Sequence, residues 1–278
     1  MTHSRSQLLG LLDEAGITLS RALGQNYVAD PNTVRRIARL AGVQPGDRVV
    51  EIGAGLGSLT LALVEAGATV LAVETDRRVA EVLQQLMVGR PVSVVVQDAL
   101  TLAWADELVQ IPGARPWSLV ANLPYNIAAT LVLDVLERVP AVESMLVMVQ
   151  REVGERLAAP PGSKVYGIPS VKLRWWAEAS VVGRVPATVF VPQPRVESAL
   201  LRIQRHPTPA SGRPREEVFA LLEQAFRQRR KMLRRSLVDH AGFEEAAGRA
   251  GVRPEARPEE LGLPDWLRLA EQLAATTD

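Results

Sequence analysis

Between residues 48 and 149, short β-rich runs alternate with helix-length segments, and this alternation constrains the fold more than any other feature. Strands are expected at 48–52, 69–73, 92–96, 117–121 and 145–149. Helices are expected between them, at 58–66, 77–87 and 127–138. Strands separated by helices pair in parallel, with helices covering both faces of the sheet. The expected fold class is therefore α/β, with a doubly wound, Rossmann-like sheet.

The flanking segments are expected to add a helical start and an antiparallel edge. Residues 5–16 predict a short helix, and Asp30-Pro31 predicts the N-cap and first turn of another helix, which ends near Gly42. Three runs with strand character then follow one another with little helix between them, at 179–182, 188–190 and 198–203. They predict that antiparallel strands close one edge of the sheet.

Residues 206–215 have the Pro-, Ser- and Gly-rich composition of a linker. We therefore expect a first domain at 1–205 and a small all-helical domain at 206–278. Apolar residues beyond the linker recur at helical spacing: Phe219, Leu222, Phe226, Leu233 and Leu237. This spacing predicts one apolar helical face.

The residue counts exclude several classes of site. The 278-residue chain has no cysteine, which excludes disulfides and thiolate metal sites. Its three histidines are far apart in the sequence, which argues against a histidine metal site. No segment reads as a signal peptide or reaches membrane-spanning length, so a soluble cytoplasmic protein is expected.

The first strand of the alternation runs directly into Gly53-Ala54-Gly55-Leu56-Gly57. Ligands bind at the carboxyl ends of strands in such sheets, and glycines there let the backbone turn tightly beneath a ligand. A dinucleotide-binding loop would carry its last glycine one residue later, where this chain has Ser58. The G-x-G-x-G spacing therefore favours a cofactor without a pyrophosphate over NAD or FAD. On this motif alone, a purely structural turn is an alternative.

Acidic residues end the next two strands. Glu74 ends the second strand, where a carboxylate can accept both hydroxyls of a ribose, and Asp98 follows the third, where an acid can bind the amino group of adenine. Each acid alone is more typical of a solvated loop residue than of a binding site. Together with the glycine loop and Asn122, they mark four successive strand ends. This order indicates an S-adenosylmethionine-dependent methyltransferase.

The tetrapeptide Asn122-Leu123-Pro124-Tyr125 follows the strand expected at 117–121. The amide oxygen of Asn122 can accept a hydrogen bond from an NH2 group. Pro124 fixes its own φ and keeps Leu123 out of the helical region, so the Leu123 carbonyl can point into a pocket. Tyr125 can stack on a base. An ordinary strand-to-helix turn is the alternative, but the preceding strand ends favour a loop that grips a planar amine.

Seven segments resemble the ribosomal RNA adenine N6-dimethyltransferase family, and most closely its members that act on small-subunit RNA. The matching segments are 23–28, 51–60, 97–99, 122–127, 149–153, 189–198 and 225–233. The resemblance runs in unbroken order from residue 21 to about 240. It implies transfer of methyl groups from S-adenosylmethionine, with no metal, to N6 of two adjacent adenosines in the 3′-terminal hairpin, a step of ribosome biogenesis. The residues themselves leave open how many methyls and adenines are involved.

The resemblance also implies roles for individual residues. The implied cofactor contacts are Gln25, Asn26, Val28, Gly53, Gly55, Glu74, Asp98 and Asn122. The implied catalytic residues are Asn122, Leu123, Pro124, Tyr125 and Phe190. In this interpretation, Tyr125 and Phe190 hold the target base between them. We expect Phe190 in a stiff, exposed segment because Pro192 and Pro194 follow it; a core aromatic is the alternative.

Six of the nine residues from 227 to 235 are basic, although the net charge is only +1. The expected RNA-binding residues are Arg227, Arg229, Arg230, Lys231 and Arg234. A helix packed on one side and basic on the other would suit phosphate contacts, while an ordinary solvated helix face is the alternative. The expected partner is small-subunit rRNA or its precursor particle, bound by a monomer without membrane contact.

Three other functions compete with this interpretation. A large-subunit rRNA methyltransferase of the antibiotic-resistance type would share the fold and the N-x-P-Y pattern. Enzymes that methylate DNA adenine or protein glutamine typically carry proline in the place of Leu123. A non-catalytic nucleic-acid-binding relative would not need the glycine loop or the acids at the strand ends.

Overall fold

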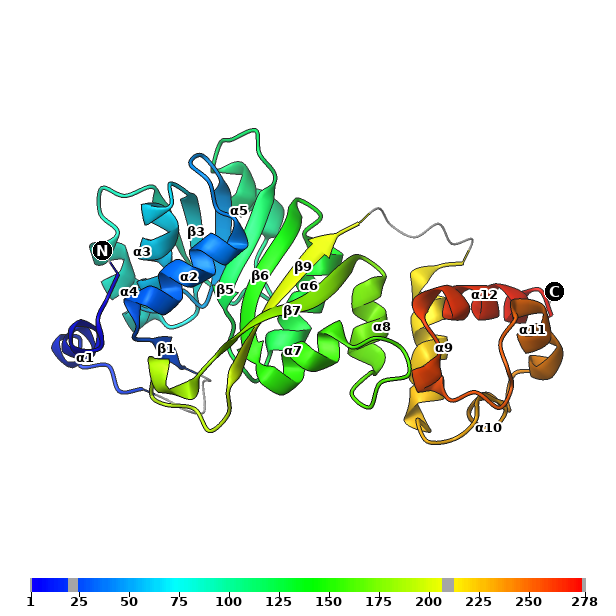
Figure 1. The fold of residues 1–278 in the computed structure, drawn as a ribbon. Coiled ribbons are helices and arrows are strands. Elements are labelled where there is room, and N and C mark those ends of the chain that lie inside the picture. The colour runs from blue at the N-terminus through cyan, green and yellow to red at the C-terminus, as the bar shows by residue number, and fades with distance from the viewer. Residues whose placement is uncertain (1, 20–24, 207–212, 277–278) are drawn as a thin grey trace. The chain divides into compact units, whose positions relative to one another are not determined.

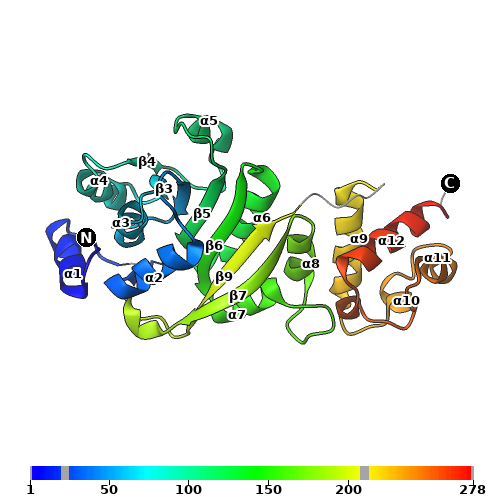
Figure 2. The ribbon, with the colours of Figure 1, turned by 45° about the horizontal axis from the view of Figure 1, so that its top comes forward.

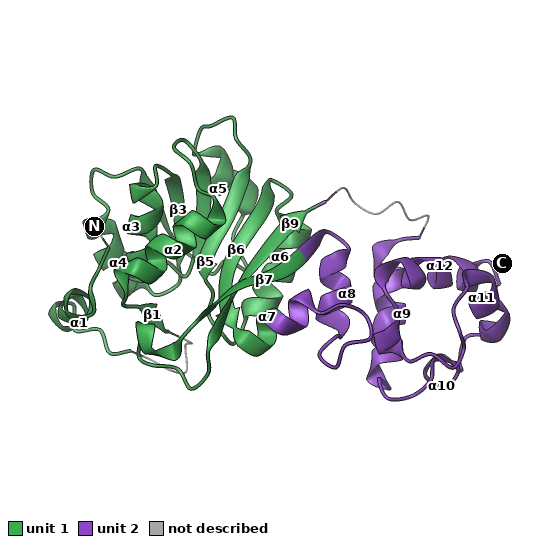
Figure 3. Ribbon diagram, in the orientation of Figure 1, with its two compact units in different colours: residues 1–154, 179–205 green, residues 155–178, 206–278 purple. Residues whose placement is uncertain are grey.

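The computed structural model describes residues 2–19, 25–206 and 213–276. These residues form two compact units (Figure 3). Unit 1 comprises residues up to 154 together with 179–205, and unit 2 comprises 155–178 together with the residues from 206 onward. Within the described part of the chain, no helix is long and apolar enough to cross a membrane.

Unit 1 is built on a seven-stranded sheet with the order β4-β3-β2-β5-β6-β9-β7 (Figure 1). In that order the strands are Val92–Val96, Thr69–Glu74, Arg48–Ile52, Trp117–Asn122, Val142–Gln150, Ser198–Arg205 and Ala177–Val185. The first five pair in parallel, and β9 pairs antiparallel with β6. The sheet confirms the predicted doubly wound α/β fold class.

Helices cover both faces of the sheet. Helices α2 (Pro31–Ala41), α3 (Ser58–Glu65) and α4 (Arg77–Leu86) share one apolar core with inward side chains of the strands. Helix α6 (Ala128–Arg138) lies on the other face (Figures 1 and 2). The sequence did not predict α5 (Trp104–Val109), α7 (Arg151–Ala158) or α8 (Ile168–Arg174). Each has at most eight residues, too few for a clear helical repeat.

Helix α2 shows why several boundaries were predictable. The Asp30 carboxylate accepts hydrogen bonds from the amides of Asn32 and Thr33, and Pro31 occupies the first turn. The helix ends at Gly42, whose φ of 73° places it in the left-handed region that glycine favours. These local signals are readable in the sequence because they need no distant partner.

The expected strand at 188–190 is wrong as an edge of the large sheet. Residues Ala187–Val189 form a 3-10 turn, and β8 (Phe190–Val191) pairs antiparallel with β1 (Tyr27–Val28) in a separate two-stranded sheet. Pro186 and Pro192 flank this segment and have no N–H to donate to a longer ladder.

The N-terminal helix α1 (Arg5–Glu14) packs against the glycine loop and α4. Its residues Leu8 and Leu12 share an apolar cluster with Leu56 of the glycine loop and Val79 of α4. The Arg78 guanidinium donates to the carbonyls of Ala15 and Gly16, at 3.1 and 2.7 Å. Residues 23 and 24 of the first family segment lie outside the described residues.

Unit 2 is helical, with α9 (Arg215–Arg227), α10 (Leu233–Ser236), α11 (Phe243–Ala250) and α12 (Leu263–Ala274). It also takes in 155–178, which differs from the boundary expected at 205/206. The rings of Trp175 and Trp176 pack edge-on against Phe219, and the Tyr166 hydroxyl donates to the Leu261 carbonyl. Of the expected linker, residues 207–212 lie outside the described residues.

Candidate functional site

A cavity of about 560 Å³ lies at the carboxyl ends of β2, β3, β4 and β5. This volume falls in the range of small-molecule sites. Eight predicted residues line the cavity: Gln25, Asn26, Gly53, Gly55, Glu74, Asp98, Asn122 and Pro124. The structure therefore brings together the glycine loop, both acids and the first and third residues of the tetrapeptide.

Gly55 is a position that only glycine fits. Its φ is +57°, and an added Cβ would lie 2.4 Å from Cε1 of Tyr27. The Tyr27 ring therefore lies directly against the glycine loop, and its burial raises the pKa of the Tyr27 hydroxyl. The sequence had flagged the loop glycines but had not assigned Tyr27 to the cavity wall.

Glu74 is 8% exposed, and backbone amides hold its carboxylate in place. Oε2 accepts from the Gly55 amide at 2.9 Å, while Oε1 accepts from the amides of Thr75 and Asp76 at 2.9 and 3.0 Å. A carboxylate has roughly four acceptor positions, so capacity remains for a hydroxyl. Glu74 thus fixes the glycine loop and presents an oriented acceptor to the cavity.

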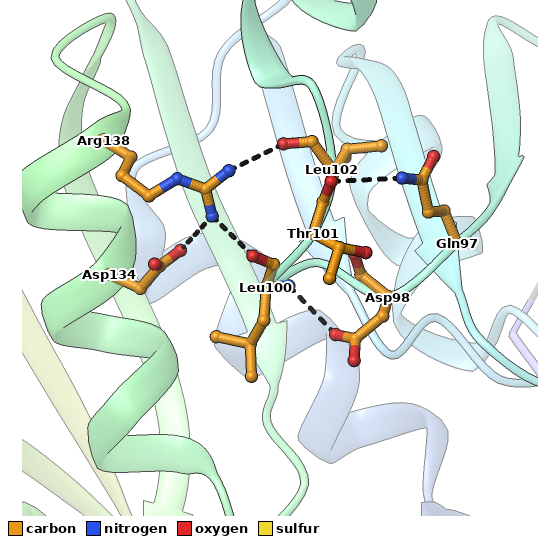
Figure 4. Close-up of polar contacts among 7 residues, drawn as sticks. All are labelled: Gln97, Asp98, Leu100, Thr101, Leu102, Asp134 and Arg138. Carbon is orange, nitrogen blue, oxygen red and sulfur yellow. Dashed lines mark hydrogen bonds and ion pairs between the residues drawn. The ribbon is translucent and has the colours of Figure 1, made fainter.

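Asp98 lies on the loop between β4 and α5. Its Oδ1 accepts from the Leu100 amide at 2.9 Å, which sets the direction of the carboxylate (Figure 4). The Asp98 side chain is exposed at the cavity, whereas Ala99 and Leu102 anchor the loop in the core. Among the described residues, no group of three or more acidic or histidine side chains is arranged to hold a metal ion.

Asn122 has an oriented amide. Its Nδ2 donates to the Asn26 carbonyl at 2.7 Å, and because a carbonyl only accepts, the NH2 end must face Asn26. The buried Oδ1 has no hydrogen-bond partner within the described residues. A buried acceptor without a partner is costly, by about 1–3 kcal/mol. The site is therefore suited to a ligand that brings an N–H donor.

The rest of the tetrapeptide is held from behind. The Leu123 side chain is buried, and its amide donates to the Met148 carbonyl at 3.0 Å. The Tyr125 hydroxyl is 2.6 Å from Oγ of Ser198. Burial raises the pKa of Tyr125. Ser198 was not predicted as a site residue, although it lies in the family segment 189–198 and could have been found there.

Four of the predicted catalytic and cofactor residues do not line the cavity: Val28, Leu123, Tyr125 and Phe190. Phe190 is fully buried in the core shared with α2 and α3, and Val28, its partner across the β1–β8 pair, is 5% exposed. The expected exposure of Phe190 is wrong because strand pairing turns the ring into the core rather than leaving it on a proline-stiffened loop. Its stacking role and the cofactor contact of Val28 stay predictions.

The sequence predicted one continuous helix through the basic run in unit 2, but the structure divides the run between two helices and a turn. Helix α9 ends at Arg227, and α10 begins at Leu233, whose amide donates to the Ala256 carbonyl. The Arg229 guanidinium pairs with Glu259 at 2.5 Å, and Arg234 lies 3.5 Å from Glu255.

Arg227, Arg230 and Lys231 are exposed. Within the described part of unit 2, Arg230 and Lys231 have no carboxylate partner. The predicted cationic surface is thus reduced by ion pairs at Arg229 and Arg234. Its free charge lies in the turn between α9 and α10.

A family model described as "Ribosomal RNA adenine dimethylase" matches residues 17–275. A "Ribosomal RNA small subunit methyltransferase A" from Kineococcus radiotolerans is 50% identical over 269 residues, covering 94% of this chain and 88% of its own length. The protein of the same name from Leifsonia xyli subsp. xyli is 48% identical over 277 residues, with 95% and 96% coverage.

Two solved structures resemble this chain in fold and cover most of its length. A crystal structure of the 23S rRNA methyltransferase ErmE has a TM-score of 0.68 and 28% identity, covering 89% of this chain and 99% of its own. A dimethyladenosine transferase from Plasmodium falciparum has a TM-score of 0.71 and 20% identity, with 89% and 97% coverage. The second likeness concerns the fold alone.

Proposed function

The chain belongs to the ribosomal RNA adenine dimethylase family, and we propose that it transfers methyl groups from S-adenosylmethionine to N6 of adenines in small-subunit rRNA. Two adjacent adenosines in the 3′-terminal hairpin are the proposed targets, each dimethylated during ribosome biogenesis. The proposed setting is the cytoplasm, and the protein acts as a monomer without a metal.

The observation that best supports this proposal is that Asn122 Oδ1, which has no partner within the described residues, belongs to a residue of the same cavity as Glu74 and Asp98. Glu74 is suited to the ribose hydroxyls of the methyl donor and Asp98 to its adenine amino group. Gly53 and Gly55 leave room for the donor beside the strand ends. Asn122 Oδ1 then remains as the acceptor for a second amine, that of the target base.

The proposed mechanism depends on positioning. The amine of adenine is a poor nucleophile because its lone pair is delocalised into the ring. Hydrogen bonds from N6 to Asn122 Oδ1 and the Leu123 carbonyl favour a pyramidal nitrogen with its lone pair free to react. S-adenosylmethionine, when bound, supplies a methyl group already activated for displacement, so alignment accounts for most of the acceleration.

The target adenine must leave its stack to reach this acceptor. Tyr125 is the proposed wall on one face of the base, and the Ser198 contact holds its hydroxyl in place. An aromatic contact of this kind contributes about 1–3 kcal/mol per base. Phe190 is the proposed second wall, which requires its ring to leave the core on substrate binding.

The relatives favour small-subunit over large-subunit RNA. Those from Kineococcus and Leifsonia are 50% and 48% identical and carry "small subunit" in their names, whereas the 23S enzyme is 28% identical. A non-catalytic nucleic-acid-binding role is disfavoured because Glu74, Asp98 and Asn122 all line one cavity. Residues 206–278 are proposed to bind RNA, with Arg227, Arg230 and Lys231 as its phosphate contacts.

The test is methyl transfer to small ribosomal subunits purified from cells that lack this modification. Labelled S-adenosylmethionine should label the small-subunit RNA, and mapping should place dimethyladenosine in its 3′-terminal hairpin. Asn122→Ala is the comparison variant and should transfer far less label. Label in large-subunit RNA alone would overturn the proposed substrate. RNA affinity that does not fall with rising salt would remove the role proposed for Arg230 and Lys231.

A further inference from the structure

The loop that carries Asp98 is short and strongly constrained. The Thr101 amide donates to the Asp98 carbonyl at 3.0 Å, and the Gln97 side chain donates to the Thr101 carbonyl at 3.2 Å. The Leu100 amide donates to Asp98 Oδ1 at 2.9 Å. The direction of the Asp98 carboxylate therefore depends on where the peptide groups around Leu100 are held.

One side chain from another element holds those peptide groups. The Arg138 guanidinium, at the end of α6, donates from Nη1 to the Leu100 carbonyl at 2.7 Å and from Nη2 to the Leu102 carbonyl at 2.9 Å (Figure 4). The two nitrogens of one rigid, planar group thus fix two carbonyls of the loop at once. The loop cannot shift without breaking both bonds.

Arg138 is itself oriented by its own helix. Asp134, one turn earlier in α6, accepts from Arg138 Nη1 at 2.9 Å (Figure 4). The side chains of Arg138 and Asp134 are only 37% and 21% exposed, so this pair is partly shielded from solvent. Burial raises the pKa of Asp134, while the neighbouring Arg138 charge opposes that rise.

Helix α6 also carries the catalytic side of the cavity. It begins at Ala128, three residues after Tyr125, and Ile127 and Leu131 line the same cavity as Asp98. Arg138 lies about 15 Å further along the helix, at 1.5 Å per residue. The contacts of Arg138 therefore tie the loop of Asp98 to the helix that follows the tetrapeptide.

We propose that Arg138 is a positioning residue, which holds the loop 98–102 so that Asp98 reads the amino group of the methyl donor's adenine. The inference rests on the proposed function, because it assumes that the cavity binds S-adenosylmethionine. Asp98 touches the ligand, and Arg138 acts through it. Lysine cannot replace Arg138, since a point charge does not bridge two carbonyls and a carboxylate in one plane.

The experiment measures how strongly the protein prefers an adenine to a hypoxanthine base. Binding of S-adenosylhomocysteine and of S-inosylhomocysteine, which has an oxygen in place of the amino group, is compared by calorimetry. Asp98→Asn should abolish the preference and sets the floor. Arg138→Gln should lose about tenfold of it, as expected when a hydrogen bond to a charged group is misplaced, and Arg138→Lys nearly as much. Asp134→Asn should lose less.

Arg48 offers a matched control. Its guanidinium also bridges two loop carbonyls, with Nε 3.0 Å from the Arg115 carbonyl and Nη1 3.2 Å from that of Ile111. Neither Arg48 nor these two loop residues line the cavity. Arg48→Gln should therefore lower thermal stability about as much as Arg138→Gln but leave the adenine preference unchanged.

The outcomes separate the two levels of inference. Equal loss of affinity for both compounds in Arg138→Gln would make Arg138 merely structural and would overturn the inference. An intact preference in Asp98→Asn would also overturn it, because Asp98 would not be the reader. If the unmodified protein bound neither compound, the proposed function itself would fail.

Discussion

The two sides of the cavity differ in how completely the chain satisfies its own polar groups. One side of the cavity, with Glu74 and Asp98, is proposed to bind the methyl donor and is called the donor side. Three backbone amides there hold the Glu74 carboxylate, and the Leu100 amide holds that of Asp98. The other side, with Asn122, is proposed to bind the base that accepts the methyl group and is called the acceptor side. Asn122 Oδ1 is buried there without a partner within the described residues. Phe190, the proposed second wall for the base, is in the core.

This difference indicates two modes of binding within one fold. The donor side is preorganised, because its acceptors already point in fixed directions from rigid strand ends. The acceptor side gains its missing hydrogen bond only when a substrate amine arrives. We therefore expect substitutions on the donor side to change cofactor affinity or folding, and substitutions on the acceptor side to change turnover with RNA.

The largest expected effect concerns Glu51, beneath the donor side. The side chain is 2% exposed and accepts from Thr60 Oγ1 at 2.6 Å; burial raises its pKa to about 8 from an ordinary value of 4.5. Between these two pH values the unfolded chain loses the proton that the folded protein keeps, so folding stability should fall as pH rises. The slope approaches about 1.4 kcal/mol per pH unit for one such proton.

Glu51→Gln should remove this slope, since glutamine keeps the Thr60 contact and does not titrate. Urea unfolding at pH 5, 6.5 and 8 would measure it in both proteins. Parallel pH profiles for the two proteins would mean that Glu51 is ionised in the folded state. Glu51 would then be better hydrated in the folded protein than its burial indicates.

The next effect tests whether Phe190 belongs to the core, the acceptor side or both. Phe190→Ala should lower the free energy of unfolding by about 3–5 kcal/mol, because it leaves a cavity among buried residues of α2 and α3. Phe190→Leu should cost much less because it refills most of that space. Denaturant unfolding measures both.

Turnover of the leucine variant then decides the second role. Leucine offers no aromatic face for a base, so methyl transfer to RNA should fall about tenfold while donor binding stays. Unchanged turnover would confine Phe190 to the core and leave Tyr125 as the only proposed wall.

Asn122→Ala is the direct test of the acceptor side. Removing the Oδ1 acceptor should lower kcat by about 10²–10³, the usual effect of losing one preorganised group at a reacting centre. Affinity for S-adenosylhomocysteine should change less than tenfold. Asn122→Asp should be as inactive as the alanine variant, because its carboxylate would face the Asn26 carbonyl that now receives an N–H. An active alanine variant would remove the central element of the proposed mechanism.

The donor side was largely predictable from the sequence because its determinants are local. The strand at 48–52 was predicted with its observed bounds, and the glycine loop, Glu74 and Asp98 follow their strands directly. Parallel pairing then brings consecutive strand ends to one edge of the sheet. No knowledge of distant contacts was required.

Apart from the short helices α5, α7 and α8, the features that were missed depend on residues far apart in the chain. The β1–β8 pairing buries Phe190. The Ala256 carbonyl accepts from the Leu233 amide at the start of α10, where the apolar spacing in the sequence predicts an uninterrupted helix. Arg138 reaches the loop of Asp98 from another helix. Periodicity and motif spacing report on one segment at a time, so they carry no signal for such contacts.

The smallest expected effect concerns the support of Tyr125. Ser198→Ala and Tyr125→Phe each remove the 2.6 Å hydroxyl contact but leave the aromatic ring. Each should lower kcat for RNA about fivefold, the equivalent of one ordinary hydrogen bond of about 1 kcal/mol. The double variant should be no worse than either single one, since both remove the same interaction. Single-turnover rates on small-subunit particles measure the effect, with S-adenosylhomocysteine affinity as the reference for the donor side. Additive losses in the double variant would mean that Ser198 acts on the substrate independently, and the acceptor side would then contain a second polar contact besides Asn122.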